Sequence, residues 1–257
     1  TVRAKQETSQ ETTLMEFNTD GTSVLELEGT RWTADATLVH INTSPCLMHE
    51  GYPQLLDATT DQWALKCTVP EGNGRGYVFI SRNGVSSAPI PFTYKKPEIL
   101  KVSPTTIPTI GGLVTIEGSN FGPQSYSTGM PRLTESRVSM GGLDIQVETW
   151  SHSRITVLVN PGTGTNRSVS IITGDYSAVS DYRISFFEPR VHTVYLQDAS
   201  SPKSPEGRYA LVVQGQNFGP QTSSVAFVLP NGDKLRATTR SWTDDEIVLL
   251  VPPGQGK

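Results

Sequence analysis

The two cysteines are the side chains of this sequence best suited to covalent chemistry. Cys67 shares one face of an alternating run with Leu65 and Val69, and Cys46 lies 21 residues earlier. If the thiols form a disulfide, it joins neighbouring parts of one domain and contributes about 3 kcal/mol by the loop-closure estimate. The alternative is a pair of buried free thiols in a cytosolic protein. The state of these cysteines therefore separates an extracellular protein from an intracellular one.

Two N-glycosylation sequons occur, Asn42–Thr43–Ser44 and Asn166–Arg167–Ser168. Sequons arise by chance, so each of them alone is weak evidence. Asn166 follows Gly164 in an expected turn, and Asn42 precedes Pro45 in a loop-like setting. Both asparagines are candidate glycosylation sites, and together with the cysteine pair they favour an extracellular protein.

Signals of an enzyme or of a cofactor are absent from the sequence. None of the four histidines has metal-ligand spacing with another His, Cys or carboxylate. There is no Gly-x-Ser-x-Gly elbow and no Cys–His pair suited to nucleophilic catalysis. The glycine-rich stretch 72–76 looks suited to phosphate, but no helix follows it. We expect no catalytic residue, no metal site and no cofactor, with His40 at a core edge and the others, His49, His152 and His192, at the surface.

The charges are few and scattered. With 21 Lys and Arg against 25 Asp and Glu, the net charge is −4, and Lys95–Lys96 is the only basic pair. Nucleic-acid binding normally needs a basic stripe, so nucleic acid is not an expected partner. The acidic cluster Asp244–Glu246 could ligate calcium, but a solvated turn before a strand is the preferred interpretation. No apolar run is long enough to cross a bilayer, so no membrane insertion is expected within this segment.

An eight-residue motif that occurs twice shows how the chain is organised. Gly-Ser-Asn-Phe-Gly-Pro-Gln-Ser at 118–125 returns as Gly-Gln-Asn-Phe-Gly-Pro-Gln-Thr at 215–222, with six of eight residues identical. An apolar alternation precedes each copy, which is typical of a half-buried strand running into a turn. Gly and Asn tolerate positive φ there, and the Phe is expected to pack onto the core. The motif residues are Gly118, Asn120, Phe121, Gly215, Asn217 and Phe218.

A second pattern sets the period of the repeat. Three apolar alternations lead to Gly74, Gly164 and Gly256, which are 90 and 92 residues apart. This unit is about the size of an immunoglobulin-like sandwich. A first copy of the eight-residue motif is then expected near residue 29. A divergent copy is present there, with Gly29 and with Trp32 in place of the Phe.

The stretch from Ser103 to Gly122 closely resembles the signature of the IPT/TIG domain. It contains Ser-Pro-Thr-Thr-Ile-Pro-Thr-Ile-Gly-Gly and, one residue later, Val-Thr-Ile-Glu-Gly-Ser-Asn-Phe-Gly. The family has immunoglobulin-like folds shared with plexins, Met-type receptors, fibrocystin-like proteins and Rel-type transcription factors. The resemblance is strongest over 97–188, good over 189–257, and weaker but in register over 12–96. Plexin-like members carry a cysteine pair similar to Cys46 and Cys67, so the resemblance implies a disulfide.

We therefore predict an all-β protein with three consecutive immunoglobulin-like (IPT/TIG, E-set) β-sandwich domains, at residues 1–96, 97–188 and 189–257. The third is expected to be truncated at its C-terminal hairpin, with the natural protein continuing beyond Lys257. Residues 1–11 are either a frayed leader or the edge strand of the first domain. The junctions at Pro97 and Pro189 are short and have no Gly/Ser spacer. They favour domains stacked in a semi-rigid rod.

Three surfaces are candidates for contact with a partner. Trp63 has no counterpart in the other copies, so it either anchors a partner or a sugar, or packs at the rim of its domain. The loop 123–136, which contains Tyr126, has no strand pattern and is expected at the surface. The third candidate is the segment from Asn42 to Tyr52.

The expected function is that of a non-enzymatic extracellular module of an adhesion protein or a receptor ectodomain. Its partner is expected to be another cell-surface or extracellular protein, a second copy of itself included. Alternatives are a repeat segment of an extracellular filament and carbohydrate-binding accessory domains of a secreted enzyme. A transcription-factor-like module is disfavoured by the acidic balance. The fold by itself does not decide among these functions.

Overall fold

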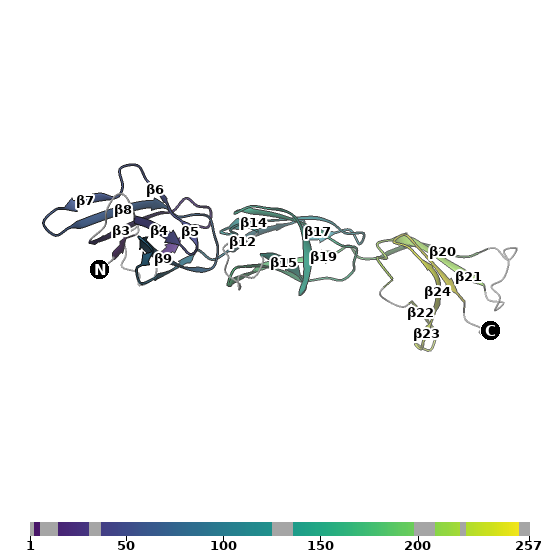
Figure 1. Cartoon of the computed structure of the whole chain (residues 1–257). Coiled ribbons are helices and arrows are strands. Elements are labelled where there is room, and N and C mark those ends of the chain that lie inside the picture. The colour runs from purple at the N-terminus through teal and green to yellow at the C-terminus, as the bar shows by residue number, and fades with distance from the viewer. Residues whose placement is uncertain are drawn as a thin grey trace. The chain divides into compact units, whose positions relative to one another are not determined.

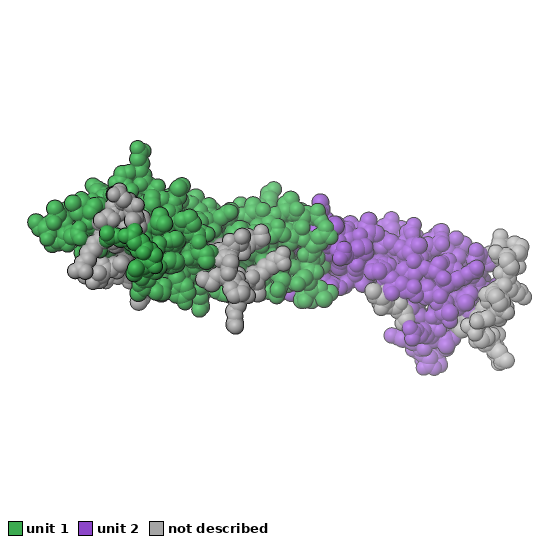
Figure 2. All heavy atoms as spheres, viewed as in Figure 1, with its two compact units in different colours: residues 1–103, 115–157, 169–181 green, residues 104–114, 158–168, 182–257 purple. Residues whose placement is uncertain are grey.

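A computed structural model describes residues 3–5, 15–30, 37–124, 136–197, 209–221 and 225–251. Within these ranges the chain is all-β and contains no helix (Figure 1). No described segment could therefore cross a membrane as a helix. The chain forms two compact units, residues 1–103, 115–157 and 169–181 in one and 104–114, 158–168 and 182–257 in the other (Figure 2). The first sequence repeat lies in the first unit, the third in the second unit, and the second repeat contributes residues to both.

The first repeat consists of two sheets. The five-stranded sheet has the order β1–β3–β8–β6, with β7 also paired to β8. Its strands are β1 (Arg3–Lys5), β3 (Val24–Thr30), β6 (Leu47–Met48), β7 (Gln54–Asp57) and β8 (Gln62–Thr68). The six-stranded sheet has the order β2–β11–β9–β4–β5, with β10 paired to β9. Its strands are β2 (Met15–Phe17), β4 (Thr37–Ile41), β5 (Ser44–Pro45), β9 (Arg75–Arg82), β10 (Val85–Ser86) and β11 (Ile90–Tyr94).

The core of the first repeat receives side chains from both sheets. Leu25 and Leu27 of β3 alternate with partly exposed residues, as a strand with one buried face requires. They share one buried cluster with Phe17 and Phe92 of the other sheet, whose ring centroids are 5.1 Å apart. Because the two sheets enclose a common core, the first repeat is a β-sandwich.

The second repeat pairs its strands in the order β12–β14–β17–β16–β15–β18–β19–β13. These are β12 (Glu98–Ser103), β13 (Thr106–Ile107), β14 (Gly112–Ser119), β15 (Arg137–Met140), β16 (Leu143–Trp150), β17 (Arg154–Val159), β18 (Arg167–Thr173) and β19 (Tyr176–Phe186). Strand β13 pairs in parallel with β19, just as β2 pairs in parallel with β11 in the first repeat. The first repeat thus has a strand equivalent to β13, although its sequence motif is too divergent to predict one.

The third repeat has a four-stranded sheet in the order β20–β21–β25–β24 and a separate β22–β23 hairpin. Its strands are β20 (Arg190–Leu196), β21 (Ala210–Gln216), β22 (Ala226–Val228), β23 (Lys234–Arg236), β24 (Thr238–Trp242) and β25 (Glu246–Leu250). Phe218, Ala237, Ile247 and Leu249 form its buried cluster. Residues 252–257 lie outside the described residues, so the truncation expected for this repeat at its C-terminal hairpin stays a prediction.

The strands and hairpin turns follow the sequence pattern closely. The expected inward residues Leu65, Cys67 and Val69 are all buried. Hairpins turn at residues 83–84, 141–142, 173–175 and 231–232, where Gly-containing stretches interrupt the apolar alternation of the sequence. Positive φ at Asn83 and Gly84 explains why Asn-Gly suits the first of these turns. Of the two alternatives for residues 1–11, Arg3–Lys5 forms an edge strand on β3.

The sheets end at the predicted junctions. Strand β11 ends at Tyr94 and β12 begins at Glu98, while β19 ends at Phe186 and β20 begins at Arg190. Among the described residues, no sheet therefore continues across Pro97 or Pro189. The two compact units do not follow the repeat boundaries.

Candidate functional site

Cys46 and Cys67 form a disulfide, with their Cα atoms 5.7 Å apart. Cys67 lies on β8 and Cys46 lies between β5 and β6, and both are part of the core of the first repeat. Of the two alternatives that the sequence left open, the structure therefore contains the bridge. It closes a loop of 21 residues, which corresponds to about 3 kcal/mol of stabilisation through the unfolded chain.

The repeated motif forms one turn, the Asn-Phe-Gly turn, at residues 120–122 and 217–219. In both copies Asn and Gly have positive φ, and the Phe side chain is buried. The Phe121 amide donates to the His152 carbonyl (3.0 Å), and the Phe218 amide donates to the Asp244 carbonyl (3.0 Å). The two turns therefore have the same hydrogen bonds, which supports their equivalence.

Two tryptophans close these turns in the same way. Trp150 Nε1 donates to the carbonyl of Gly122, and Trp242 Nε1 donates to the carbonyl of Gly219, both at 2.8 Å. The two tryptophans are therefore equivalent, although Trp150 is 28 residues and Trp242 is 23 residues from the glycine that it contacts. Gly118 opens its copy as glycine because a Cβ there would collide with the backbone oxygen of Glu98. In the first repeat, Gly29 pairs with Trp63 of β8, and Trp32 lies outside the described residues.

The Gly-x-Gly loop, at residues 72–74 and 162–164, is the second structure that repeats. A Cβ at Gly72 would lie 2.5 Å from Cζ of Tyr94, and one at Gly162 would lie 2.8 Å from Cζ of Phe186. The first glycine is thus needed because an aromatic ring from the last strand packs on its Cα. A backbone hydrogen bond also fixes each loop. The Gly72 amide donates to the Thr19 carbonyl, and the Gly162 amide donates to the Thr109 carbonyl. Sequence reasoning did not find the equivalence of these two threonines.

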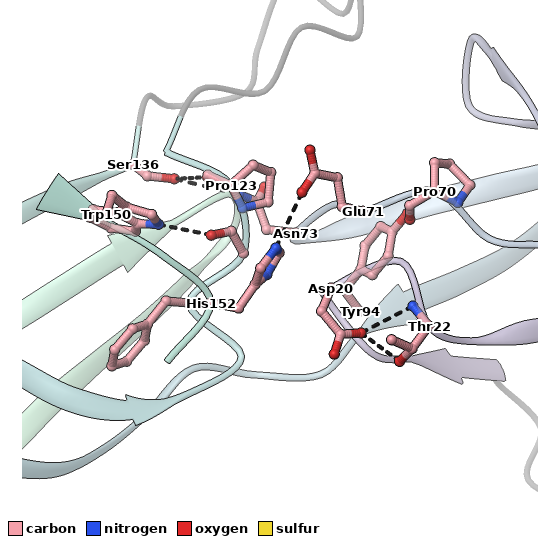
Figure 3. A network of polar contacts seen from close by, with 12 residues as sticks. Asp20, Thr22, Pro70, Glu71, Asn73, Tyr94, Pro123, Ser136, Trp150 and His152 are labelled. Carbon is pink, nitrogen blue, oxygen red and sulfur yellow. Dashed lines mark hydrogen bonds and ion pairs between the residues drawn. The ribbon is translucent and has the colours of Figure 1, made fainter. Parts of the chain in front are cut away.

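Each Gly-x-Gly loop packs against the Asn-Phe-Gly turn of the following repeat, and we call this contact a joint. At the first joint, Asn73 is buried, and its Nδ2 lies 3.4 Å from both the Pro123 carbonyl and Ser136 Oγ (Figure 3). A Cβ on Gly122 would lie 3.0 Å from Cβ of Asn73. A Cβ on Gly174 would lie 2.8 Å from Oδ1 of Asn73. Small residues on both sides let the backbones approach closely.

Charged groups surround the first joint. His152 Nε2 lies 3.2 Å from Glu71 Oε2 (Figure 3), and Lys96 Nζ lies 5.7 Å from the ring centroid of Tyr176. Hydrogen bonds from Thr22, with a smaller contribution from His152, lower the pKa of Asp20 despite its partial desolvation. Partly exposed pairs of this kind contribute at most about 1 kcal/mol each. His152 was expected at the surface, but its Nδ1 is buried and has no hydrogen-bond partner among the described residues.

The second joint repeats the first with different side chains. A Cβ on Gly219 would collide with the methyl group of Thr163 and lie 3.3 Å from the Gly162 carbonyl oxygen. Asp244 accepts hydrogen bonds from the Gly219 amide (2.9 Å) and from Thr109 Oγ1. Asp244 occupies the position that His152 has at the first joint. The acidic cluster thus includes a carboxylate that accepts hydrogen bonds from the backbone of Gly219 and from Thr109, where the preferred interpretation of the sequence was a solvated turn.

The two sequon asparagines have different environments. Asn42 is 5% exposed, and its Oδ1 accepts a hydrogen bond from the Tyr77 amide (2.9 Å). A glycan on its Nδ2 requires this buried amide group to leave its site, so the burial counts against modification there. Asn166 is exposed, and its backbone amide donates to Ser185 Oγ (3.1 Å). Glycosylation stays a prediction at both positions.

The structure brings two of the predicted partner surfaces together at one sheet edge. Strands β6 and β7 both pair with the same side of β8 and lie at the end of the strand order. We call β6 and β7 the leucine edge, because Leu47, Leu55 and Leu56 are 75%, 44% and 48% exposed. Trp63 pairs with Leu55, but its ring packs on the core, and its Nε1 donates to Asp61 Oδ1 (2.8 Å). The rim alternative therefore fits Trp63, while Tyr126 lies outside the described residues.

A short turn orders the tip of the β7–β8 hairpin beside the leucine edge. One carboxyl oxygen of Asp57 accepts from the amide (2.8 Å) and the hydroxyl (2.6 Å) of Thr59. The other accepts from the hydroxyl of Thr60 (2.8 Å). These hydrogen bonds, led by the Thr59 hydroxyl, lower the pKa of Asp57 to about 2.

Within the described ranges, no three His, Cys, Asp or Glu side chains gather where they could hold a metal ion. His40 bonds Ser81 Oγ (2.8 Å) and stacks on Phe79 at 4.9 Å, which is the core-edge position expected for it.

Comparison with known proteins identifies one domain family. The IPT/TIG domain matches residues 11–94 and 97–186. No curated protein sequence matches the chain.

Several solved structures have a similar fold. They include the extracellular region of plexin A4 (16% identity, 92% of this chain, 20% of that chain, TM-score 0.35). Another is the adhesin InvE of Yersinia pseudotuberculosis (9%, 93%, 74%, TM-score 0.44). A third is the surface glycan-binding protein PbSGBP-B from Prevotella bryantii (12%, 88%, 53%, TM-score 0.41). The chain spans 20% and 30% of the two plexin A4 structures.

Proposed function

Because the chain belongs to the IPT/TIG family, we propose that it is an extracellular module that recognises another protein without catalysing a reaction. IPT/TIG domains are typically non-catalytic. The Cys46–Cys67 disulfide supports an oxidising, extracellular location, since such bridges are rare in reducing compartments. The role is that of part of an adhesion protein or a receptor ectodomain.

The proposal includes a third IPT/TIG domain at residues 189–257, after those at 1–96 and 97–188. Its support is the Asn-Phe-Gly turn at 217–219, which has the same positive φ angles and the same Trp–Gly hydrogen bond as the turn at 120–122. The buried Phe218 lies where Phe121 lies in the second repeat.

The short junctions at Pro97 and Pro189, which have no Gly/Ser spacer, support a scaffold with stiff connections between consecutive repeats. A flexible linker would leave the loop glycines free, whereas Gly122 and Gly219 each touch the preceding Gly-x-Gly loop. Close backbone packing at both joints restricts hinge motion more than the weak exposed ion pairs do. The semi-rigid connection that the sequence predicts between repeats is therefore kept as part of the proposal.

The leucine edge is the observation that carries the recognition function. An edge strand offers unpaired backbone groups to a strand of another protein, and exposed leucines add apolar contact area. Leu47, Leu55 and Leu56 supply that area on β6 and β7. The partner is expected to add a strand there, and a second copy of the chain is one partner able to do so.

Capture from a cell-surface extract, together with light scattering of the purified chain, tests this function. The wild-type chain is expected to self-associate or to retain one protein, and Leu47→Ser combined with Leu55→Ser is expected to weaken binding about tenfold or more. Leu143→Ser is the matched control, because Leu143 is 69% exposed on β16, away from this edge. Equal binding by the wild type and the double variant would refute the leucine edge as the recognition surface.

A further inference from the structure

A pocket of about 610 Å³ lies in the second unit beside the sequon asparagine Asn166. Its lining includes Thr165, Ser185, Phe187, Glu188, Arg190 and Gln216. Phe187 is 44% exposed although it is a large apolar side chain. The pocket therefore combines an accessible aromatic ring with a set of polar side chains.

The polar groups of this pocket suit a neutral, hydroxyl-rich ligand. Among the described residues, the side chains of Glu188, Arg190 and Gln216 have no hydrogen-bond or ion-pair partner. Together they offer donors and acceptors, and the carboxylate and the guanidinium balance each other in charge. An exposed ring beside such groups can cover the apolar face of a pyranose. A phosphate would meet the carboxylate of Glu188, and a single carboxylate is a poor metal site.

Asn166 lies at the rim of the pocket. Its backbone amide donates to Ser185 Oγ (3.1 Å), and both Ser185 and the residue before Asn166, Thr165, line the pocket. Asn166 is exposed and has positive φ (58°). The next side chain, Arg167, is held by the Thr163 carbonyl (2.6 Å), and its guanidinium lies 5.6 Å from the ring centroid of Phe186. A sugar attached to Asn166 would therefore begin beside the opening of the pocket.

We propose that Asn166 carries an N-linked glycan whose first N-acetylhexosamine units occupy this pocket. The sugar packs on Phe187 and accepts and donates hydrogen bonds with Glu188, Arg190 and Gln216. It thereby holds the segment 186–190, which connects β19 to β20 at the second joint. This inference rests on the proposed extracellular location, because N-glycans are added in the secretory pathway.

Hydrogen exchange of the full chain, secreted from a eukaryotic host, tests the proposal. Intact mass and peptide mapping are expected to find a glycan at Asn166. Exchange over residues 186–190 is expected to be about tenfold slower in the glycosylated chain than after enzymatic removal of the glycan. Phe187→Ala is expected to abolish this protection while the glycan stays attached. The matched control Tyr195→Ala, an exposed aromatic on β20, is expected to retain it.

Three results would overturn the proposal. One is a secreted chain with no glycan at Asn166, and another is equal exchange over 186–190 with and without the glycan. The third is binding of free N,N′-diacetylchitobiose to the pocket when the attached glycan gives no protection, which would assign the pocket to another molecule's sugar. The leucine-edge variants test the recognition function separately, so failure of one proposal is distinguishable from failure of the other.

Discussion

Replacing Gly72 by Ala is expected to destabilise the first repeat through one contact. The added Cβ would lie 2.5 Å from Cζ of Tyr94, about 1 Å inside normal carbon–carbon contact. Tyr94 is fully buried, and its hydroxyl donates to the Pro70 carbonyl (2.9 Å), so the ring has no space to move into. Overpacking of this kind costs about 1–3 kcal/mol, and disturbing the tyrosine hydrogen bond adds about 1 kcal/mol. The expected loss of unfolding free energy is therefore about 2–4 kcal/mol.

Urea denaturation of the full chain measures this loss, with Gly112→Ala as the matched control. Neither Gly72 nor Gly112 has positive φ, and a Cβ at Gly112 meets nothing within 4 Å. Gly112→Ala is accordingly expected to be neutral, or to stabilise by about 0.4–1 kcal/mol through the unfolded state.

A double-mutant cycle with Tyr94→Leu tests whether the ring is the cause. In the Tyr94→Leu background, Gly72→Ala should cost less, with a coupling of about 1 kcal/mol or more. If Gly72→Ala costs no more than Gly112→Ala, or if the cycle shows no coupling, the packing argument for the Gly-x-Gly loop is wrong.

Three further outcomes are expected. Replacing Cys46 and Cys67 by Ala should lower the unfolding free energy of the first repeat by about 3 kcal/mol, and an unchanged urea midpoint would contradict this. Trp150→Phe leaves the buried carbonyl of Gly122 without its donor, so calorimetry should show a loss of about 1–3 kcal/mol. Because the folded pKa of Asp57 is about 2, below the usual 3.8, its hairpin contribution is present above pH 3.8 and is lost as the pH falls through about 2. NMR titration of the hairpin amides should show this, and a midpoint near 3.8, the ordinary pKa of an aspartate, would count against it.

Burial at Asn42 changes how the two sequons are interpreted. From the sequence, both asparagines follow the same consensus in loop-like settings. In the fold, Asn42 Oδ1 accepts a hydrogen bond from β9, whereas Asn166 is exposed beside a pocket. The difference comes from a strand far away in sequence, so no local pattern could have revealed it.

Local features of the sequence were sufficient to predict the strands, the hairpins and the repeat. Side chains alternate between the two faces of a strand, so apolar residues at every second position mark β8, β17 and β25. Positive φ is accessible to Gly and Asn, so Asn120 and Gly122 mark a turn wherever they recur. Strand alternation and the preference of Gly and Asn for positive φ both act over a few residues, so a single sequence is enough to predict their consequences.

Tertiary structure alone decided which of these elements meet. The joints place Asn73 against Pro123 and Asp244 against Thr109, pairs that are 50 and 135 residues apart. The leucine edge exists because β6 and β7 share the same side of β8. Such contacts depend on how the folded strands and loops pack against one another. That packing is set by the shape and volume of side chains from segments distant in the sequence. The sequence thus determined the repeated unit, and the packed chain determined how its surfaces are joined and which of them stay open.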